Sequence, residues 1–208
     1  MKHLLTAVIF LDLVTVLKAD EKKEEVNAVT GATVKKADWT GSAQNVHGKK
    51  ILVIYYSRTG NTKKVSEDIA KSLGADIEGI TDLRKRSGFW GYMKAARDAM
   101  KKKTTEIGET VKNPAEYDLV IAGTPIWAGK MAPAVRTYLM KFSVSIKSAA
   151  FFTTAGGSSP EKTLAGMKEI IGKDPVATAS FAGKELKDEK IYNGKLTAFI
   201  ESVVKVSK

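Results

Sequence analysis

The feature of this sequence that most restricts its fold is a regular alternation of strand-like and helix-like segments from Lys50 onward. Residues 51–56 (ILVIYY) form a continuous apolar run, which is typical of a strand buried on both faces of a parallel sheet. Residues 61–73 then carry apolar side chains at the spacing of a helix with one buried stripe, and Gly74 is a typical residue at a helix end. This alternation predicts an α/β fold.

The same alternation continues to the C-terminus. The later predicted elements are a strand over 76–81, a helix over 89–103, a strand over 117–124, a helix over 132–142, a strand over 148–154, a helix over 160–171, a strand over 175–181 and a helix over 193–206. Five strands alternating with five helices predict a doubly wound parallel sheet with helices on both faces, because β-α-β connections are right-handed.

Three segments that follow predicted strands consist mainly of small or conformationally permissive residues. They are YSRTGNT at 56–62, TPIWAGKMAP at 124–133 and TTAGGSSP at 153–160. Because ligands of doubly wound sheets bind outside the carboxyl ends of the strands, these segments are expected to meet there. The sequence therefore predicts a ligand site at this edge of the sheet.

The composition excludes several kinds of active site. The chain has no cysteine, which excludes disulfides, thiolate metal sites and cysteine nucleophiles. Its two histidines, His3 and His47, both precede the alternating part of the chain. This position disfavours a Ser-His-Asp triad or a histidine-bound metal in the sheet, and no metal site is predicted. Redox chemistry would need an imported cofactor.

The chain carries a formal net charge of +11, with an isoelectric point near 9.6. This charge favours partners with acidic surfaces, or it simply keeps the protein in solution. The basic residues are spread along the sequence, except at 84–86 and 101–103, and no basic stripe alternates with aromatic residues. No specific nucleic-acid binding is predicted.

The region before the alternating body divides into two parts. Residues 1–19 contain a basic start and a short apolar run, which resembles a secretory signal or a membrane anchor. Asp12 interrupts this run, and Leu17 stands where a cleaved signal usually has a small residue. A cytoplasmic location is therefore favoured, with export or anchoring as the alternative. Residues 20–49 are expected to be a polar linker to a domain over 50–208.

The first of the three segments has the composition of a phosphate-binding loop. It lacks the lysine of a P-loop and the G-x-G-x-x-G pattern of dinucleotide sites. Gly60 would let the backbone approach a phosphate at the start of the following helix, and Arg58 either adds charge or points outward. The side-chain donors available to such a phosphate are Ser57, Thr59, Asn61 and Thr62.

These residues make the sequence similar to the flavodoxin family. YYSRTGNT resembles the family's loop for the phosphate of FMN, and GTPIWAGKMAPAVRTYL and FFTTAGGS resemble further parts of a subgroup of that family. The resemblance covers about residues 50–206 and implies a flavodoxin-like sheet of five parallel strands in the order 2-1-3-4-5, with FMN at its carboxyl edge. The cofactor contacts that it implies are Ser57, Arg58, Thr59, Gly60, Asn61, Thr62, Thr124, Pro125, Ile126, Trp127, Ala128, Gly129, Thr153, Thr154, Ala155, Gly156 and Gly157.

The resemblance also implies roles within this set. Trp127 is expected to lie against the flavin ring, and the alternative is a place in the core. Ala128–Gly129 is expected to form a peptide that can reorient near the ring, and residues 153–157 are expected to offer N–H groups to its pyrimidine edge. The aromatic residues of the second predicted helix either reach this site or a partner subunit, or they pack in the core: Phe89, Trp90 and Tyr92.

A second, shorter resemblance lies in the predicted linker. The stretch VNAVTGATV is similar to the attachment signature of proteins that carry FMN covalently on a threonine, which here would be Thr33. Asn27 stands where that signature usually has an acidic residue, and the surrounding domain of those proteins is absent from this sequence. Chance similarity in a linker rich in glycine and threonine is the favoured alternative.

The expected function is electron transfer between redox partner proteins by bound FMN, with the chemistry on the flavin and no catalytic side chain. One alternative is an NAD(P)H-dependent FMN oxidoreductase. Another is a non-catalytic module whose basic face binds an acidic macromolecule. The sequence predicts neither the electron donor and acceptor nor the oligomeric state, and residues 1–19 leave membrane contact open.

Overall fold

The computed structural model of the protein describes residues 48–84 and 88–206. Its strands are β1 (Ile51–Tyr55), β2 (Asp76–Gly79), β3 (Leu119–Trp127), β4 (Lys130–Met131), β5 (Ala149–Ala155) and β6 (Thr178–Ala182). Its helices are α2 (Asn61–Leu73), α3 (Gly88–Met100), α4 (Pro133–Phe142), α5 (Glu161–Ile171) and α6 (Glu189–Val206), with short 3-10 helices η1 (Pro114–Glu116) and η2 (Glu185–Lys187).

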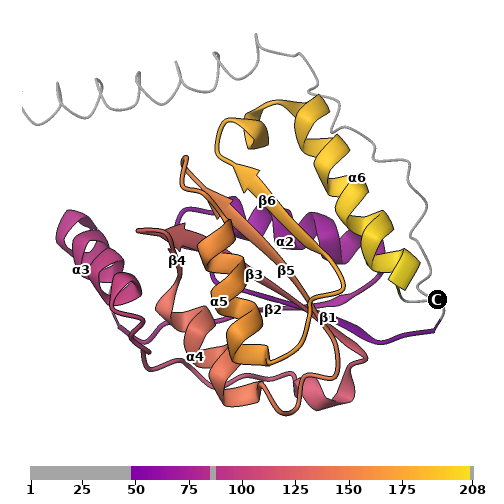
Figure 1. Ribbon diagram of the computed structural model, residues 1–208, viewed down its shortest axis with the longest axis horizontal. Coiled ribbons are helices and arrows are strands. Elements are labelled where there is room, and N and C mark those ends of the chain that lie inside the picture. The colour runs from indigo at the N-terminus through magenta and orange to yellow at the C-terminus, as the bar shows by residue number, and fades with distance from the viewer. Residues whose placement is uncertain (1–47, 85–87, 207–208) are drawn as a thin grey trace, which may run out of the picture. The chain divides into compact units, whose positions relative to one another are not determined.

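The sheet has the order β2-β1-β3-β5-β6, and all of these neighbours are parallel (Figure 1). Counted without β4, this is the expected order 2-1-3-4-5. The short strand β4 pairs antiparallel with the end of β3 and was not predicted. Helices α2 and α6 cover one face of the sheet, and α4 and α5 cover the other, with α3 beside β3, β4 and α4. The prediction of a doubly wound α/β sheet is therefore confirmed.

The core is formed by the central strands, which are buried on both faces as their continuous apolar runs indicate. Leu52 and Ile54 of β1, Ile121 of β3, and Phe151 and Phe152 of β5 are fully buried. Removing a side chain of this size from water contributes about 1.5–3 kcal/mol. The edge strand β2 is short and half-exposed, in keeping with its mixed sequence DIEG.

Most predicted element boundaries agree with the structure, and the differences have local causes. Helix α2 spans Asn61–Leu73 as predicted and ends at Gly74, whose left-handed backbone lets its N–H donate to the Ala70 carbonyl. Strand β3 runs to Trp127 rather than 124, because its last residues pair with β4. Helix α6 begins at Glu189 rather than 193, after the 3-10 turn η2.

Several predictions concern residues that the structure does not describe. The apolar segment 1–19, the linker up to residue 47 and Thr33 all lie outside the described residues. The division into these segments and a domain over 50–208 stays a prediction. Within residues 48–84 and 88–206, no helix combines the length and the apolar character needed to cross a membrane.

A polar pair ties the edge strand β2 to the segment that precedes β3. The hydroxyl of Tyr117 donates a hydrogen bond to Asp76 Oδ2 at 2.7 Å, and Lys112 Nζ lies 3.3 Å from Asp76 Oδ1. The hydrogen bond from Tyr117, followed by that from Lys112, holds the pKa of Asp76 below its ordinary value of 3.8. Burial and the same hydrogen bond raise the pKa of Tyr117 to about 12.

This pair predicts part of the acid sensitivity of the fold. The pKa of Asp76 is lower in the folded state than in the unfolded state, so its stabilisation is complete above the unfolded value and is lost as the pH falls through the folded value. We expect the urea midpoint to fall less between about pH 7 and about pH 3 in Asp76→Asn than in the parent protein. Tyr117→Phe should reduce the same pH dependence; an unchanged dependence in both variants would contradict the assignment.

Candidate functional site

Three loops meet at the carboxyl edge of the sheet, as the sequence indicated. They follow β1, β3 and β5, which are adjacent parallel strands and therefore end at the same edge (Figure 1). The first loop leads into α2, the second is the turn between β3 and β4, and the third leads into α5. The edge thus carries all the segments from which the predicted contacts come.

The first loop leaves the N-terminus of α2 open. Gly60 is its N-cap residue with φ of 93°, and no side-chain hydrogen bond caps the helix among the described residues. The Gly60 carbonyl accepts the first helical hydrogen bond, from the Lys64 N–H at 2.9 Å. Because the first N–H groups of a helix have no acceptor within it, this end presents free donors and the positive end of the helix dipole.

The side chains of this loop add donors around the open helix end. Thr59 and Asn61 are exposed, and Ser57 is half-exposed with its Oγ accepting a hydrogen bond from the Gly60 N–H at 3.2 Å. That bond uses a lone pair of Ser57, so its hydroxyl hydrogen can still donate. Arg58 is exposed as well. The first turn of α2 contains no acidic residue. Donors and dipole together form a site suited to an anion such as a phosphate.

Thr62 is a buried residue that connects this loop to the third loop. Its side chain is 1% exposed, and its Oγ1 lies 2.8 Å from Oγ1 of Thr154, at the end of β5. The Thr62 carbonyl accepts a hydrogen bond from Ser66 Oγ at 2.8 Å. The buried hydroxyl pair therefore fixes the start of α2 against the third loop.

The hydroxyl pair gives a prediction for stability. Thr62→Val should lower the free energy of unfolding by about 1–3 kcal/mol, because it leaves the buried Thr154 hydroxyl without its partner. The double variant Thr62→Val/Thr154→Val should recover most of this loss, since both polar groups are then replaced by methyl groups of similar shape. Urea unfolding of the parent, Thr62→Val, Thr154→Val and the double variant measures the coupling, and additive losses would contradict the assignment.

The second loop is a two-residue hairpin turn rather than an open loop. Ala128 has φ of 48° and Gly129 has φ of 73°, and Trp127 pairs with Lys130 across the turn. Positive φ at both central residues is the geometry of a type I′ turn, which matches the twist of paired strands. The exposed Ala128 is strained in this region, whereas Gly129 is not.

Thr124 holds this hairpin in place from inside the sheet. Its side chain is fully buried; its Oγ1 accepts a hydrogen bond from the Ala132 N–H at 3.0 Å and donates one to the Pro125 carbonyl at 3.0 Å. The hydroxyl thus connects the end of β3 to the residue that precedes α4. Its hydrogen-bonding capacity is used within the protein.

Trp127 lies in the hydrophobic core. It is 5% exposed and packs edge-on against Tyr56, with ring centroids 5.5 Å apart and planes at 89°. Its predicted contact with a flavin face stays a prediction, and the buried position matches the alternative stated for this residue. Ile126 is also buried, and Pro125 is half-exposed.

The third loop combines buried threonines with exposed glycines. Thr153 Oγ1 donates to Ser180 Oγ of β6 at 3.0 Å, and Thr154 binds Thr62 as described. Beyond them the chain becomes accessible: Ala155 is half-exposed, and Gly156 and Gly157 are exposed. Within residues 153–157, backbone N–H groups rather than side chains are therefore what this loop can offer a ligand.

The structure divides the predicted contacts into two groups. The accessible group is Ser57, Arg58, Thr59, Gly60, Asn61, Pro125, Ala128, Gly129, Ala155, Gly156 and Gly157. The buried group is Thr62, Thr124, Ile126, Trp127, Thr153 and Thr154. Three supporting residues were missed because only the fold brings them here: Tyr56, Ala132 and Ser180.

Two further predictions concern aromatic side chains and metal ions. Phe89, Trp90 and Tyr92 fall in α3, but their side chains lie outside the described residues. Among the residues that the structure describes, no group of three or more His, Cys, Asp or Glu side chains could hold a metal ion.

Comparisons with known proteins identify the family. A family model described as flavodoxin matches residues 50–203. Among similar solved structures are a flavoprotein from Lactobacillus acidophilus NCFM in complex with FMN (23% identity, 68% of this chain and 99% of that chain, TM-score 0.57), a flavoprotein from Bacteroides eggerthii (24%, 73% and 98%, 0.56) and a flavodoxin from the domain Archaea (19%, 76% and 99%, 0.50). The chain belongs to the flavodoxin family.

Proposed function

We propose that this protein is an FMN flavoprotein that transfers electrons between redox partners. The observation that carries the proposal is the open N-terminus of α2, surrounded by hydroxyl donors in a chain of the flavodoxin family. A terminal phosphate fits this position, since it would supply acceptors for the free N–H groups and a negative charge for the helix dipole. The similar flavoprotein from L. acidophilus was crystallised in complex with FMN.

In this proposal the accessible residues of the three loops contact the cofactor. Ser57, Thr59 and Asn61 donate hydrogen bonds to the phosphate, and Gly60 lets the backbone come close to it. The turn at Ala128–Gly129 and the N–H groups of residues 155–157 border the flavin ring. The bound flavin would supply one- or two-electron chemistry, while the protein supplies binding, orientation and exclusion of water.

The buried threonines act as positioning residues in this arrangement. Thr62 and Thr154 hold the phosphate loop and the third loop together, and Thr124 fixes the hairpin. Each of these hydroxyl groups already has a protein partner in the structure, so direct contact with FMN is assigned to their accessible neighbours.

The partners of such a flavoprotein are proposed from its charge. A net charge of +11 favours association with proteins that present acidic surfaces, and such association weakens as salt is added.

A carrier and an NAD(P)H-dependent oxidoreductase differ in one observable: the flavin of an oxidoreductase bleaches on mixing with NADH or NADPH alone. A cytoplasmic location is part of the proposal, because FMN held without a covalent bond would be left behind if the chain crossed a membrane unfolded.

An absorption spectrum of the purified protein tests the proposal. We expect a flavin spectrum, either as purified or after addition of FMN and removal of the excess, and release of the pigment on acid precipitation. A protein that stays colourless after exposure to FMN would refute the proposal. Such a result, together with salt-sensitive binding to nucleic acid, would favour the basic binding module.

Pigment that remains with the acid precipitate of the parent but not of Thr33→Ala would establish a covalent link at that residue.

A further inference from the structure

A cavity of about 200 Å³ lies outside the proposed cofactor site, on the face of the sheet that α4 and α5 cover. It is lined by Lys102, Lys130, Met131, Arg136, Lys162, Ala165, Gly166 and Glu169. None of the residues predicted to contact FMN lines it. Helix α2 covers the opposite face, so the proposed phosphate loop at its N-terminus and this cavity are separate features.

The lining of this cavity is strongly cationic. Four basic side chains come from the end of the α3 region, β4, α4 and α5, against the single carboxylate of Glu169. In the described part of the chain, Lys102 is the one of the four with an ion-pair partner, Glu169, at 3.8 Å. The lining therefore carries an excess of positive charge, which attracts anions.

Arg136 is the central observation, because it is a largely buried residue whose guanidinium has no hydrogen-bond partner among the described residues. The residue is 8% exposed and lines the cavity. Its guanidinium makes no hydrogen bond or close ion pair with the described residues, although a buried guanidinium normally has such partners. Burial lowers the pKa of Arg136, and the charge of Glu169 opposes this. A planar group with five donors thus faces the cavity, and the described residues make no hydrogen bond or close ion pair with it, although Glu169 also lines the space.

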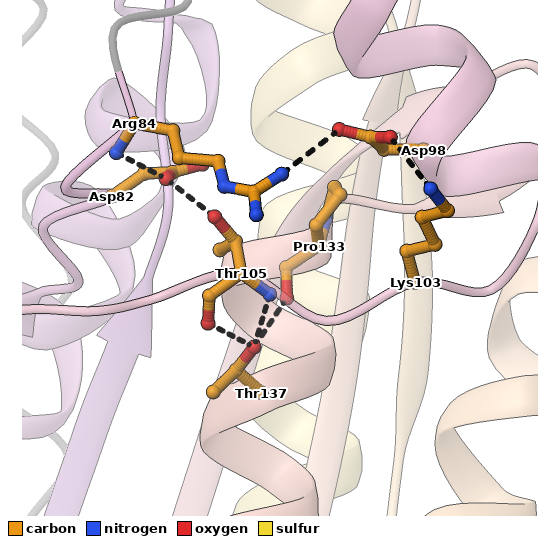
Figure 2. A network of polar contacts seen from close by, with 7 residues as sticks. All are labelled: Asp82, Arg84, Asp98, Lys103, Thr105, Pro133 and Thr137. Atoms are coloured by element: carbon orange, nitrogen blue, oxygen red, sulfur yellow. Dashed lines mark hydrogen bonds and ion pairs between the residues drawn. The ribbon is translucent and has the colours of Figure 1, made fainter.

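The residues on either side of Lys102 take part in a network of polar contacts (Figure 2). Thr137 Oγ1 of α4 accepts a hydrogen bond from the Thr105 N–H at 2.9 Å, and Thr105 Oγ1 donates to Asp82 at 2.9 Å. Asp98 is 5% exposed and lies 4.0 Å from Lys103 Nζ. Thr105 thereby ties the segment that follows Lys102 to α4, the helix that carries Arg136.

The backbone of Lys102 is strained in the position that it occupies. Its φ is 51°, and it ends α3 with hydrogen bonds from its own N–H to the Ala99 carbonyl and from the Lys103 N–H to the Asp98 carbonyl, both at 2.9 Å. Glycine is the usual residue at such a helix end, because a side chain is disfavoured at positive φ. A lysine kept at this position is a strained residue at the rim of a cationic cavity, which is consistent with a role in binding.

We propose that this cavity binds a phosphate group, either inorganic phosphate or a phosphate carried by a nucleotide. The planar fork of Arg136 suits two phosphate oxygens, and the lysines supply further charge around the remaining oxygens. The cavity is too small for a whole nucleotide and adjoins the hairpin through Lys130, so a nucleotide would place only its phosphate inside. The proposal does not depend on FMN binding.

Nuclear magnetic resonance of the full-length, nitrogen-15-labelled protein in excess FMN tests the proposal. Inorganic phosphate is titrated at constant ionic strength against chloride, and the amide signals of Met131 and Gly166 report on the cavity. The Gly60 amide reports separately on the phosphate loop. We expect saturable shifts at the cavity signals; shifts that are linear, or equal in chloride, both with inorganic phosphate and with NADPH in its place would overturn the proposal. Failure of FMN to bind would appear at Gly60 and leave the cavity signals interpretable.

Three variants make the test specific. Arg136→Met removes the buried cation at similar volume and should weaken phosphate binding at least about tenfold without lowering the urea midpoint. Lys102→Gly should also weaken binding while it raises the midpoint, because it relieves the left-handed strain. Arg97→Met, on the exposed surface of α3, loses the same charge and should bind phosphate within about twofold of the parent. Equal binding by Arg136→Met and the parent would overturn the assignment.

A comparison of NADPH with NADH identifies the source of the phosphate. These molecules differ by one phosphate monoester, so tighter binding of NADPH that Arg136→Met abolishes assigns the cavity to a nucleotide phosphate. Equal cavity shifts with both dinucleotides, alongside saturable binding of inorganic phosphate, assign it to the free ion. Absence of saturable cavity shifts with phosphate and with NADPH would refute the proposal.

Discussion

Gly123→Ala is expected to lower the free energy of unfolding by about 3 kcal/mol, at the upper end of what one added methyl group costs in a packed core. A Cβ at Gly123 would lie 2.2 Å from Cζ and 2.5 Å from Cε1 of Phe152. Gly123 and Phe152 are paired between β3 and β5, the two strands at the centre of the core. Phe152 is fully buried and contacts the rings of Phe181 and Phe199. The ring therefore has little room to move, and the measurement is the urea unfolding curve.

Two further variants separate this clash from a general effect of replacing glycine. Gly194→Ala, in α6, meets no atom within 4 Å and should stabilise the protein by up to about 1 kcal/mol through helix propensity. Phe152→Leu should cost about 1 kcal/mol alone, yet it should reduce the cost of Gly123→Ala by giving the methyl group space. If Gly123→Ala unfolds at the same urea concentration as the parent, the packing around Phe152 adjusts to the added methyl group without a cost in stability, and the prediction is wrong.

The importance of Gly123 could not be predicted from the sequence. The apolar run around it predicted a buried strand, and this prediction is confirmed. That a glycine must stand at this position depends on the register between β3 and β5, which places Phe152 beside it. Register is a property of pairing between distant segments, whereas the pattern of apolar residues is local.

The hairpin between β3 and β4 was missed for a related reason. Its turn is Ala128–Gly129, and the common sequences for a type I′ turn are Asn-Gly and Asp-Gly. Alanine at φ of 48° is disfavoured locally, so the sequence gives only a weak signal. The hydrogen bond from Ala132 to the buried Thr124 closes the hairpin across eight positions of sequence and outweighs the local preference.

The elements around the candidate site were better predicted, because their signal is local. A strand, a loop of hydroxyl residues with a glycine, and a helix follow one another within residues 51–73, and the structure has them in these places. The sequence did not distinguish donors that are accessible to a ligand from donors whose hydrogen bonds are made within the protein. The Thr62 hydroxyl bonds to that of Thr154, which lies 92 positions away. Such hydrogen bonds can be recognised only in the folded arrangement of the loops.

Asn61→Asp, at the open N-terminus of α2, is expected to stabilise the apoprotein and to weaken FMN binding. A carboxylate in the first turn of a helix interacts favourably with the free N–H groups and the dipole, which contributes about 0.3–1 kcal/mol. The first turn of α2 has no acidic residue at present, and Asn61 is exposed, so the change introduces no burial. The urea midpoint of the apoprotein should therefore rise.

The same carboxylate should raise the dissociation constant of FMN by about a hundredfold. A phosphate monoester carries nearly two negative charges, and repulsion within one helical turn costs about 2–3 kcal/mol at an exposed site. The matched control is Lys71→Gln, which makes an equal change in net charge in the last turn of α2. It should leave FMN affinity within about twofold and lower the apoprotein midpoint slightly. Fluorescence titration with FMN measures both affinities, and equal weakening by the two variants would mean that net charge rather than the helix end controls binding.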